Sequence, residues 1–187
     1  MHRTLSRTAL LLALSLLPLS LALGGCDDPL GLGDAQIAAD SIDLELASPG
    51  SVDPSAIDVL SNPPGLRYPE RSVDAQEWDV QLRRAGAGFV LAPFTSLGGS
   101  RAAGIVRSGT DYAAVDEAPR GRSQYSLDPV SIQEGATYFI RSRNLNCVKY
   151  GVVKVVDLDA AAGTGRFVIR SNIACDDERL PLPDAED

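Results

Sequence analysis

Apolar and polar residues alternate along this chain in many short runs, and no stretch keeps the 3.6-residue period of a helix over a helical length. Trp78, Val80 and Leu82, for example, are separated by polar residues, and Thr137–Arg141 and Val148–Leu158 are rich in β-branched and aromatic side chains. Such runs are typical of strands that bury one face. The pattern therefore predicts an all-β chain, a mostly antiparallel single β-domain with long loops.

The expected strands number roughly seven to nine. The clearest runs span residues 37–46, 79–82, 88–94, 137–141, 148–158 and 166–173, with a shorter strand at 57–60 and an apolar stretch at 102–106. Residues 112–117 fit either a helical turn or the end of a strand. Five prolines lie between residues 49 and 69, so we expect most of that segment to be loop.

The first 25 residues have the pattern of a bacterial export signal. Two arginines precede an apolar run from Ala9 to Ala22, which is too short for a comfortable transmembrane helix. The run ends in Leu23-Gly24-Gly25-Cys26, which resembles the lipobox of bacterial lipoproteins. We therefore predict that residues 1–25 are a removable signal peptide and that Cys26 becomes the lipidated first residue. An ordinary secretory signal followed by a chance cysteine is the alternative.

The rest of the chain divides by composition. Residues 26–36 are predicted to be a flexible tether, 37–175 the β-domain, and 176–187 an acidic tail that we expect to be poorly ordered. A lipid anchor would hold the domain at a membrane of the bacterial cell envelope. Asp27 and Asp28 resemble an inner-membrane retention signal in some bacteria and a surface-export signal in others. Both alternatives stay open, with the outer membrane or cell surface preferred.

Removal of the signal peptide changes the composition in a way that excludes several functions. It leaves 15 basic against 25 acidic residues, a net charge of −10, which argues against a nucleic-acid partner. Met1 and His2 are the only methionine and histidine, and both leave with the signal peptide. The mature chain then lacks the usual general base near neutral pH and the commonest ligand of zinc, copper or haem iron.

The remaining two cysteines predict a disulfide, because an even pair in an exported domain is usually bonded. If the last two strands form a hairpin around the loop at residues 159–165, a single register places the two cysteines opposite each other and also pairs the apolar side chains on the same face. Its facing pairs are Cys147–Cys175, Val153–Ile169 and Val155–Phe167. We therefore expect a C-terminal hairpin clamped by a disulfide. Two free thiols or a metal-binding pair are the alternatives.

Two stretches carry a family resemblance. The first is EWDVQLRR at Glu77–Arg84, followed after a Gly/Ser-rich segment by DYAAVDEAP at Asp111–Pro119. The second is Tyr138–Arg143 (YFIRSR) with Lys149–Val155 (KYGVVKV). In this order and spacing, over about residues 76–173, the chain resembles the HmuY family of haem-binding bacterial lipoproteins. The resemblance implies a mostly antiparallel β fold, lipid anchoring and capture of haem.

The sequence departs from that family at the iron ligands. Family members hold haem iron with histidine or methionine, and the mature chain has neither. Tyrosine can also ligate haem iron. The five candidates are Tyr68, Tyr112, Tyr125, Tyr138 and Tyr150, of which Tyr138 and Tyr150 fall in expected strands and fit packing roles better.

Other candidate residues each have a structural interpretation that we prefer. Trp78 could stack on a ligand, but a lone tryptophan in an alternating strand is more often core. Asp157 and Asp159 near Gly163 resemble part of a calcium loop, but they fit a solvated hairpin end better. The arginines could bind carboxylates such as haem propionates, or they could balance the acidic residues. They are Arg83, Arg84, Arg101, Arg107, Arg120, Arg122, Arg141 and Arg143.

These observations favour a membrane-anchored, non-enzymatic lipoprotein that binds an unidentified small molecule or an envelope protein. We predict no metal, and no cofactor apart from the haem that the resemblance implies. The alternative function is haem uptake with atypical ligation, for instance by tyrosine. A hydrolase has little support, because no Ser/His/Asp set can form without histidine.

Overall fold

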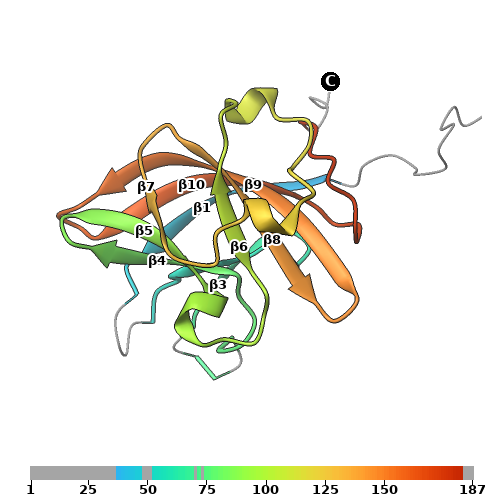
Figure 1. The fold of residues 1–187 in the computed structure, drawn as a ribbon. Coiled ribbons are helices and arrows are strands. Elements are labelled where there is room, and N and C mark those ends of the chain that lie inside the picture. Colours follow the sequence, from blue (N-terminus) through green and yellow to red (C-terminus); the bar gives the residue numbers. More distant parts are fainter. Residues whose placement is uncertain (1–36, 48–51, 70, 73, 183–187) are drawn as a thin grey trace, which may run out of the picture. The chain divides into compact units, whose positions relative to one another are not determined.

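The computed structural model describes residues 37–47, 52–69, 71–72 and 74–182. The predicted signal peptide, Cys26 and the whole predicted tether lie outside them. The described residues form an all-β domain of ten strands in two five-stranded sheets, with three short 3₁₀ helices (Figure 1). Every strand pair is antiparallel, which confirms the predicted fold class.

The two sheets have five strands each, but the first contains the longest strand, which lies near the C-terminus. Its order is β1 (Ile37–Glu45), β10 (Thr164–Asn172), β9 (Cys147–Asp159), β8 (Thr137–Asn144) and β6 (Gly104–Arg107). The second has the order β3 (Gly65–Arg67), β2 (Ala56–Asp58), β4 (Val80–Ala85), β5 (Gly88–Pro93) and β7 (Val130–Ile132). The 3₁₀ helices are η1 (Phe94–Leu97), η2 (Tyr112–Ala114) and η3 (Arg122–Gln124).

The main hydrophobic core takes side chains from both sheets. Leu44, Tyr138 and Phe167 of the first sheet and Ile57 and Leu82 of the second expose none of their surface and belong to one cluster. Burying each large apolar side chain contributes about 1.5–3 kcal/mol. The sheets therefore form a β-sandwich around one core, as alternating strands with one apolar face require.

The C-terminal hairpin has the predicted register. Val153 pairs with Ile169 and Val155 with Phe167, and a bulge between Arg166 and Phe167 shifts the pairing near the turn. The Cys147–Cys175 disulfide is present, with 5.1 Å between the Cα atoms, although Cys175 lies beyond the end of β10. A bond that closes a loop of this size stabilises the fold by about 3–4 kcal/mol on the chain-entropy model.

The tail after the disulfide is partly folded, so the expectation that it is poorly ordered is wrong for Asp176–Leu182. Leu180 is fully buried in a second apolar cluster, and its backbone N–H donates to the carbonyl of Asp116. Figure 1 shows this tail in red beside the orange strands, where the backbone N–H of Asp176 donates to the carbonyl of Val148 in β9. Residues 183–187 lie outside the described part of the chain.

Arg170 of β10 holds the tail and the η2 segment against the first sheet. Its guanidinium is fully buried and donates to the carbonyl oxygens of Leu180 at 2.8 Å, Tyr112 at 2.8 Å and Val115 at 2.7 Å. The guanidinium carbon also lies 4.2 Å from the centre of the Tyr112 ring. Two segments far apart in sequence thus share one buried cation.

Two strands were not predicted, β3 and β7. Each has three residues, so neither shows enough alternation to be recognised from its own sequence. Both lie at the edges of the second sheet and are defined by pairing with a neighbour, β3 with β2 and β7 with β5. The ambiguous segment 112–117 contains a helical turn, η2.

Candidate functional site

A cluster of buried charged and polar side chains joins the two sheets, and we call it the charge cluster. It consists of Asp58 at the end of β2, Asp79 just before β4, Arg101 in the loop before β6, Ser142 of β8 and Lys149 of β9. Asp58 and Asp79 expose 2% and 0% of their surface. Carboxylates this deeply buried need partners, and the cluster supplies them.

Arg101 lies between the two carboxylates. Its Nη1 donates to Oδ1 of Asp58 at 2.7 Å and to Oδ1 of Asp79 at 3.4 Å. The second oxygen of Asp58 accepts from Arg67 Nη2 at 2.9 Å. Asp79 also accepts the backbone N–H of Val59 at 2.7 Å. Arg101 is therefore fixed on one side by the buried acids.

Ser142 and Lys149 complete the cluster from the first sheet. The Ser142 hydroxyl donates to Asp79, and the Lys149 ammonium donates to the carbonyl of Leu60 at 2.8 Å. Gly151 lets that segment come close, because a Cβ there would lie 2.9 Å from the Val59 side chain. The contacts between the sheets at this end are thus polar, beside an otherwise apolar core.

Burial shifts the pKa of two of these groups. It raises the pKa of Asp79 to about 6, and the nearby charge of Asp58 adds to the rise. The charge of Arg101 and the hydrogen bonds from Ser142 and Val59 act in the opposite direction. Burial likewise lowers the pKa of Lys149, opposed by the two carboxylates. Asp79 therefore titrates in a mildly acidic range.

A hollow of about 400 Å³ lies next to the charge cluster, and we call it the arginine hollow. Its lining residues are Gln76, Glu77, Ser100, Arg101, Arg143, Asn144 and Leu145. Arg101 belongs to both features. The backbone N–H of Arg143 donates to the carbonyl of Ala102 at 3.1 Å, which joins β8 to the loop that carries Arg101.

Leu145 is unusual at the rim of this hollow. It lies in the turn between β8 and β9, exposes 85% of its surface and has a φ of 47°. Bulky L-residues rarely adopt this left-handed conformation, which costs roughly 1–2 kcal/mol. The conformation follows from the two-residue hairpin turn between the paired residues Asn144 and Cys147, which requires a positive φ. The exposed leucine beside two arginines makes this hollow the stronger candidate site.

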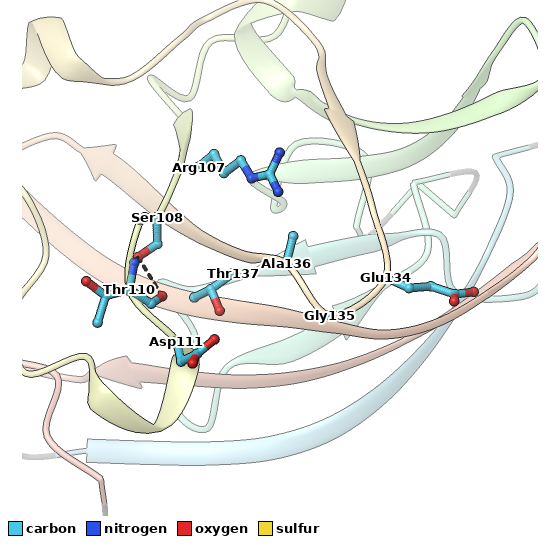
Figure 2. Close-up of a pocket in the computed structure, with 9 residues that line it drawn as sticks. Arg107, Ser108, Thr110, Asp111, Glu134, Gly135, Ala136 and Thr137 are labelled. Atoms are coloured by element: carbon cyan, nitrogen blue, oxygen red, sulfur yellow. Dashed lines mark hydrogen bonds between the residues drawn. The ribbon is translucent and has the colours of Figure 1, made fainter.

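A second hollow of about 350 Å³ lies where β6 ends, next to the turn before β8. Figure 2 shows Ser108, Thr110, Asp111 and Thr137 on one side of it and Glu134 pointing away from them. Ser108 and Thr110 bond to each other at 2.9 Å, and Glu134 accepts the backbone N–H of Leu158 at 3.0 Å. Ser108 and Glu134 thus have partners within the fold, and the lining holds no large apolar side chain, so this hollow is the weaker candidate.

The tyrosines fit packing roles. Tyr138, Tyr125 and Tyr150 expose 0%, 5% and 6% of their surface. The Tyr125 hydroxyl donates to the carbonyl of Pro119 at 2.8 Å, and the Tyr138 hydroxyl to that of Ser131 at 3.2 Å. None of the five tyrosines is among the lining residues of either hollow.

The structural interpretations of Trp78 and of the hairpin end are confirmed. Trp78 exposes 4% of its surface and packs against Phe94 with 4.3 Å between ring centres. Asp159 accepts the backbone N–H groups of Ala161 and Ala162 at 2.8 Å and so closes the β9–β10 turn. Within the described part of the chain, no three His, Cys, Asp or Glu side chains are grouped to hold a metal ion.

The predicted arginines have different surroundings. Arg101 is paired in the charge cluster, Arg120 binds Glu178, and Arg84 donates to the carbonyl of Ala160 at 2.8 Å. Arg107 lines the second hollow. Arg143 makes no ion pair within the described residues, and its Nε lies 3.4 Å from the carbonyl of Leu145. Sequence reasoning named Arg101 and Arg143 but could not single them out.

Comparison with known proteins identifies no relative. No family model matches the chain, and neither the curated proteins nor the solved structures give a match. The described residues include no helix long and apolar enough to cross a membrane.

Proposed function

We propose that this chain is a lipid-anchored protein of the bacterial cell envelope whose β-sandwich is a non-enzymatic binding domain. One observation carries the anchoring: the disulfide uses Cys147 and Cys175, so Cys26 is the only one of three cysteines left for acylation. The bond also fits an oxidising compartment outside the cytoplasm. The lipobox-like residues before Cys26 supply the matching export signal.

Mass spectrometry of the full chain, purified from bacterial membranes, tests the anchoring. We expect an N-terminal peptide that begins at Cys26 and carries acyl chains. A Cys26→Ser variant is the matched control, and it should lose both the acylation and the membrane association while retaining the disulfide. Recovery of an unmodified chain that keeps residues 1–25 would overturn the proposal.

For the binding role, the arginine hollow supplies a ready location. Two cationic side chains, one carboxylate, two amides, a hydroxyl and an exposed leucine line it, so several polar groups converge beside one apolar side chain. Haem uptake, which the resemblance implies, gains no support from the surroundings of the tyrosines. A haem titration of the purified chain should leave the Soret band of free haem unchanged. A band that shifts at one equivalent and is lost on a Tyr→Phe change would favour haem uptake instead.

A further inference from the structure

The arginine hollow combines features that select a ligand by charge and by shape. Its lining carries Arg101 and Arg143 against a single acid, Glu77, in a chain whose overall charge is −8. Because Asp58 and Asp79 already pair with Arg101, Arg143 supplies the positive charge that has no ion pair within the described residues, and one such charge suits a monoanion better than a dianion. The lining of the hollow thus has more basic than acidic side chains, although the protein as a whole is acidic.

The two guanidinium groups are prepared for binding in different ways. Arg101 is held from behind by Asp58 and Asp79, and its side chain keeps 9% of its surface exposed at the hollow. Its hydrogen bonds to the cluster all use Nη1, which leaves Nε and Nη2 without a hydrogen bond within the described residues. Arg143 is exposed and makes no ion pair there. One guanidinium held in place beside a second that can still change its rotamer suits a planar carboxylate.

Leu145 supplies the apolar part of the site. It lies in the β8–β9 turn, two residues after Arg143, and exposes 85% of its surface. We propose that the arginine hollow binds small organic monocarboxylates, with the carboxylate between Arg101 and Arg143 and an apolar chain against Leu145. This inference deepens the binding role proposed above and rests on it.

The test uses the full chain in a non-ionic detergent, with hexanoate as the probe and calorimetry or ligand-observed NMR as the readout. Hexanol lacks the charge, acetate lacks the apolar chain, and hexyl phosphate carries a larger charge. We expect saturable binding of hexanoate that is about tenfold tighter than that of hexanol, which lacks the charge-assisted bidentate contact, and several-fold tighter than that of acetate, which lacks the apolar contact. Hexyl phosphate should bind no tighter than hexanoate, because Glu77 in the lining and the two acids behind Arg101 disfavour a second negative charge. Equal binding of hexanol and hexanoate would overturn the inference.

Single substitutions locate the site. Arg143→Gln should weaken hexanoate binding about tenfold, and Leu145→Gly about threefold to tenfold, because each removes one of the two kinds of contact. Arg107→Gln, in the second hollow, is the matched control and should leave binding unchanged. An Arg143→Gln protein that binds hexanoate like the parent would also overturn the inference.

The same preparation separates this inference from the proposed anchoring. Mass spectrometry reports the acylation of Cys26, and the titration reports the hollow. An acylated chain that does not bind hexanoate refutes the monocarboxylate site alone. An unacylated chain that binds it refutes the anchoring alone.

Discussion

Arg170 and Arg101 are both largely buried, but their partners differ. Arg170 is surrounded by backbone carbonyls of the η2 segment and the tail, none of which can titrate. Arg101 is paired with two carboxylates, one of which has its pKa raised to about 6. The first arrangement encloses a cation and fastens chain segments. The second fixes a cation while part of it still faces a hollow, which is what a binding site requires.

The largest expected effect follows from removing the enclosed cation. Arg170→Met leaves three carbonyls without their donor, and we expect the free energy of unfolding to fall by about 3–5 kcal/mol. The loss should be the same at pH 5 and pH 8, because burial raises the pKa of Tyr112, the titratable group beside Arg170, above its usual value, so that it stays neutral at both. Urea denaturation measures it. Arg107→Met, which removes an exposed arginine, is the control and should change stability by less than about 0.5 kcal/mol. A pH-dependent loss at Arg170 would contradict the comparison.

Removing the paired cation should give a smaller and pH-dependent loss. In Arg101→Met, Asp58 keeps Arg67, and Asp79 can take up a proton at acidic pH. We expect a loss of about 1 kcal/mol at pH 5 that grows to about 3 kcal/mol at pH 8, where Asp79 must be charged without its partner. Denaturation curves at the two pH values test this. Equal losses at both would show that Asp79 does not respond to Arg101.

The titration of Asp79 itself has a definite sign. Its folded pKa of about 6 lies above the ordinary value of 3.8, so the folded state binds more protons between these pH values. Stability should therefore fall as the pH rises from about 4 to about 6, by on the order of 1–3 kcal/mol. In Asp79→Asn this component should disappear. The difference between the two proteins isolates it, since all other groups are shared. Parallel pH profiles would rule out the raised pKa.

The smallest expected change concerns Leu145. Glycine adopts a positive φ without the steric cost, so Leu145→Gly should leave the stability unchanged or raise it by up to about 1 kcal/mol. Thermal unfolding measures the change. A weaker hexanoate interaction in a protein of equal or higher stability would separate a binding role from a structural one. A clear destabilisation would instead show that the leucine packs.

The sequence predicted the C-terminal hairpin well, because two independent constraints agreed. The apolar stripe of β9 and β10 and the two cysteines required one register. The sequence did not predict the folded tail, because Leu180 and Leu182 lie among charged and proline residues and make too short a run to show a period. The burial of Leu180 depends on Arg170, ten residues earlier, and on Asp116, which is distant in sequence.

The charge cluster could not be predicted for a related reason. Alternation from Trp78 to Leu82 indicates a half-buried strand, with Asp79 and Gln81 on the polar side. Both are buried, because Asp79 meets Arg101 and Ser142, and Gln81 donates to Ser55 at 3.1 Å. A period of two identifies the faces of one strand but cannot say what covers the second face.

The folded tail after the disulfide, Asp176–Leu182, also determines how far the chain can be shortened. The disulfide at Cys175 and the buried Leu180 fasten the chain well past its last strand. Digestion with a carboxypeptidase should therefore leave Leu180 in place. A truncated gene ending at Asn172 would lack both Cys175 and Leu180, expose the apolar surface of the first sheet and yield aggregated protein.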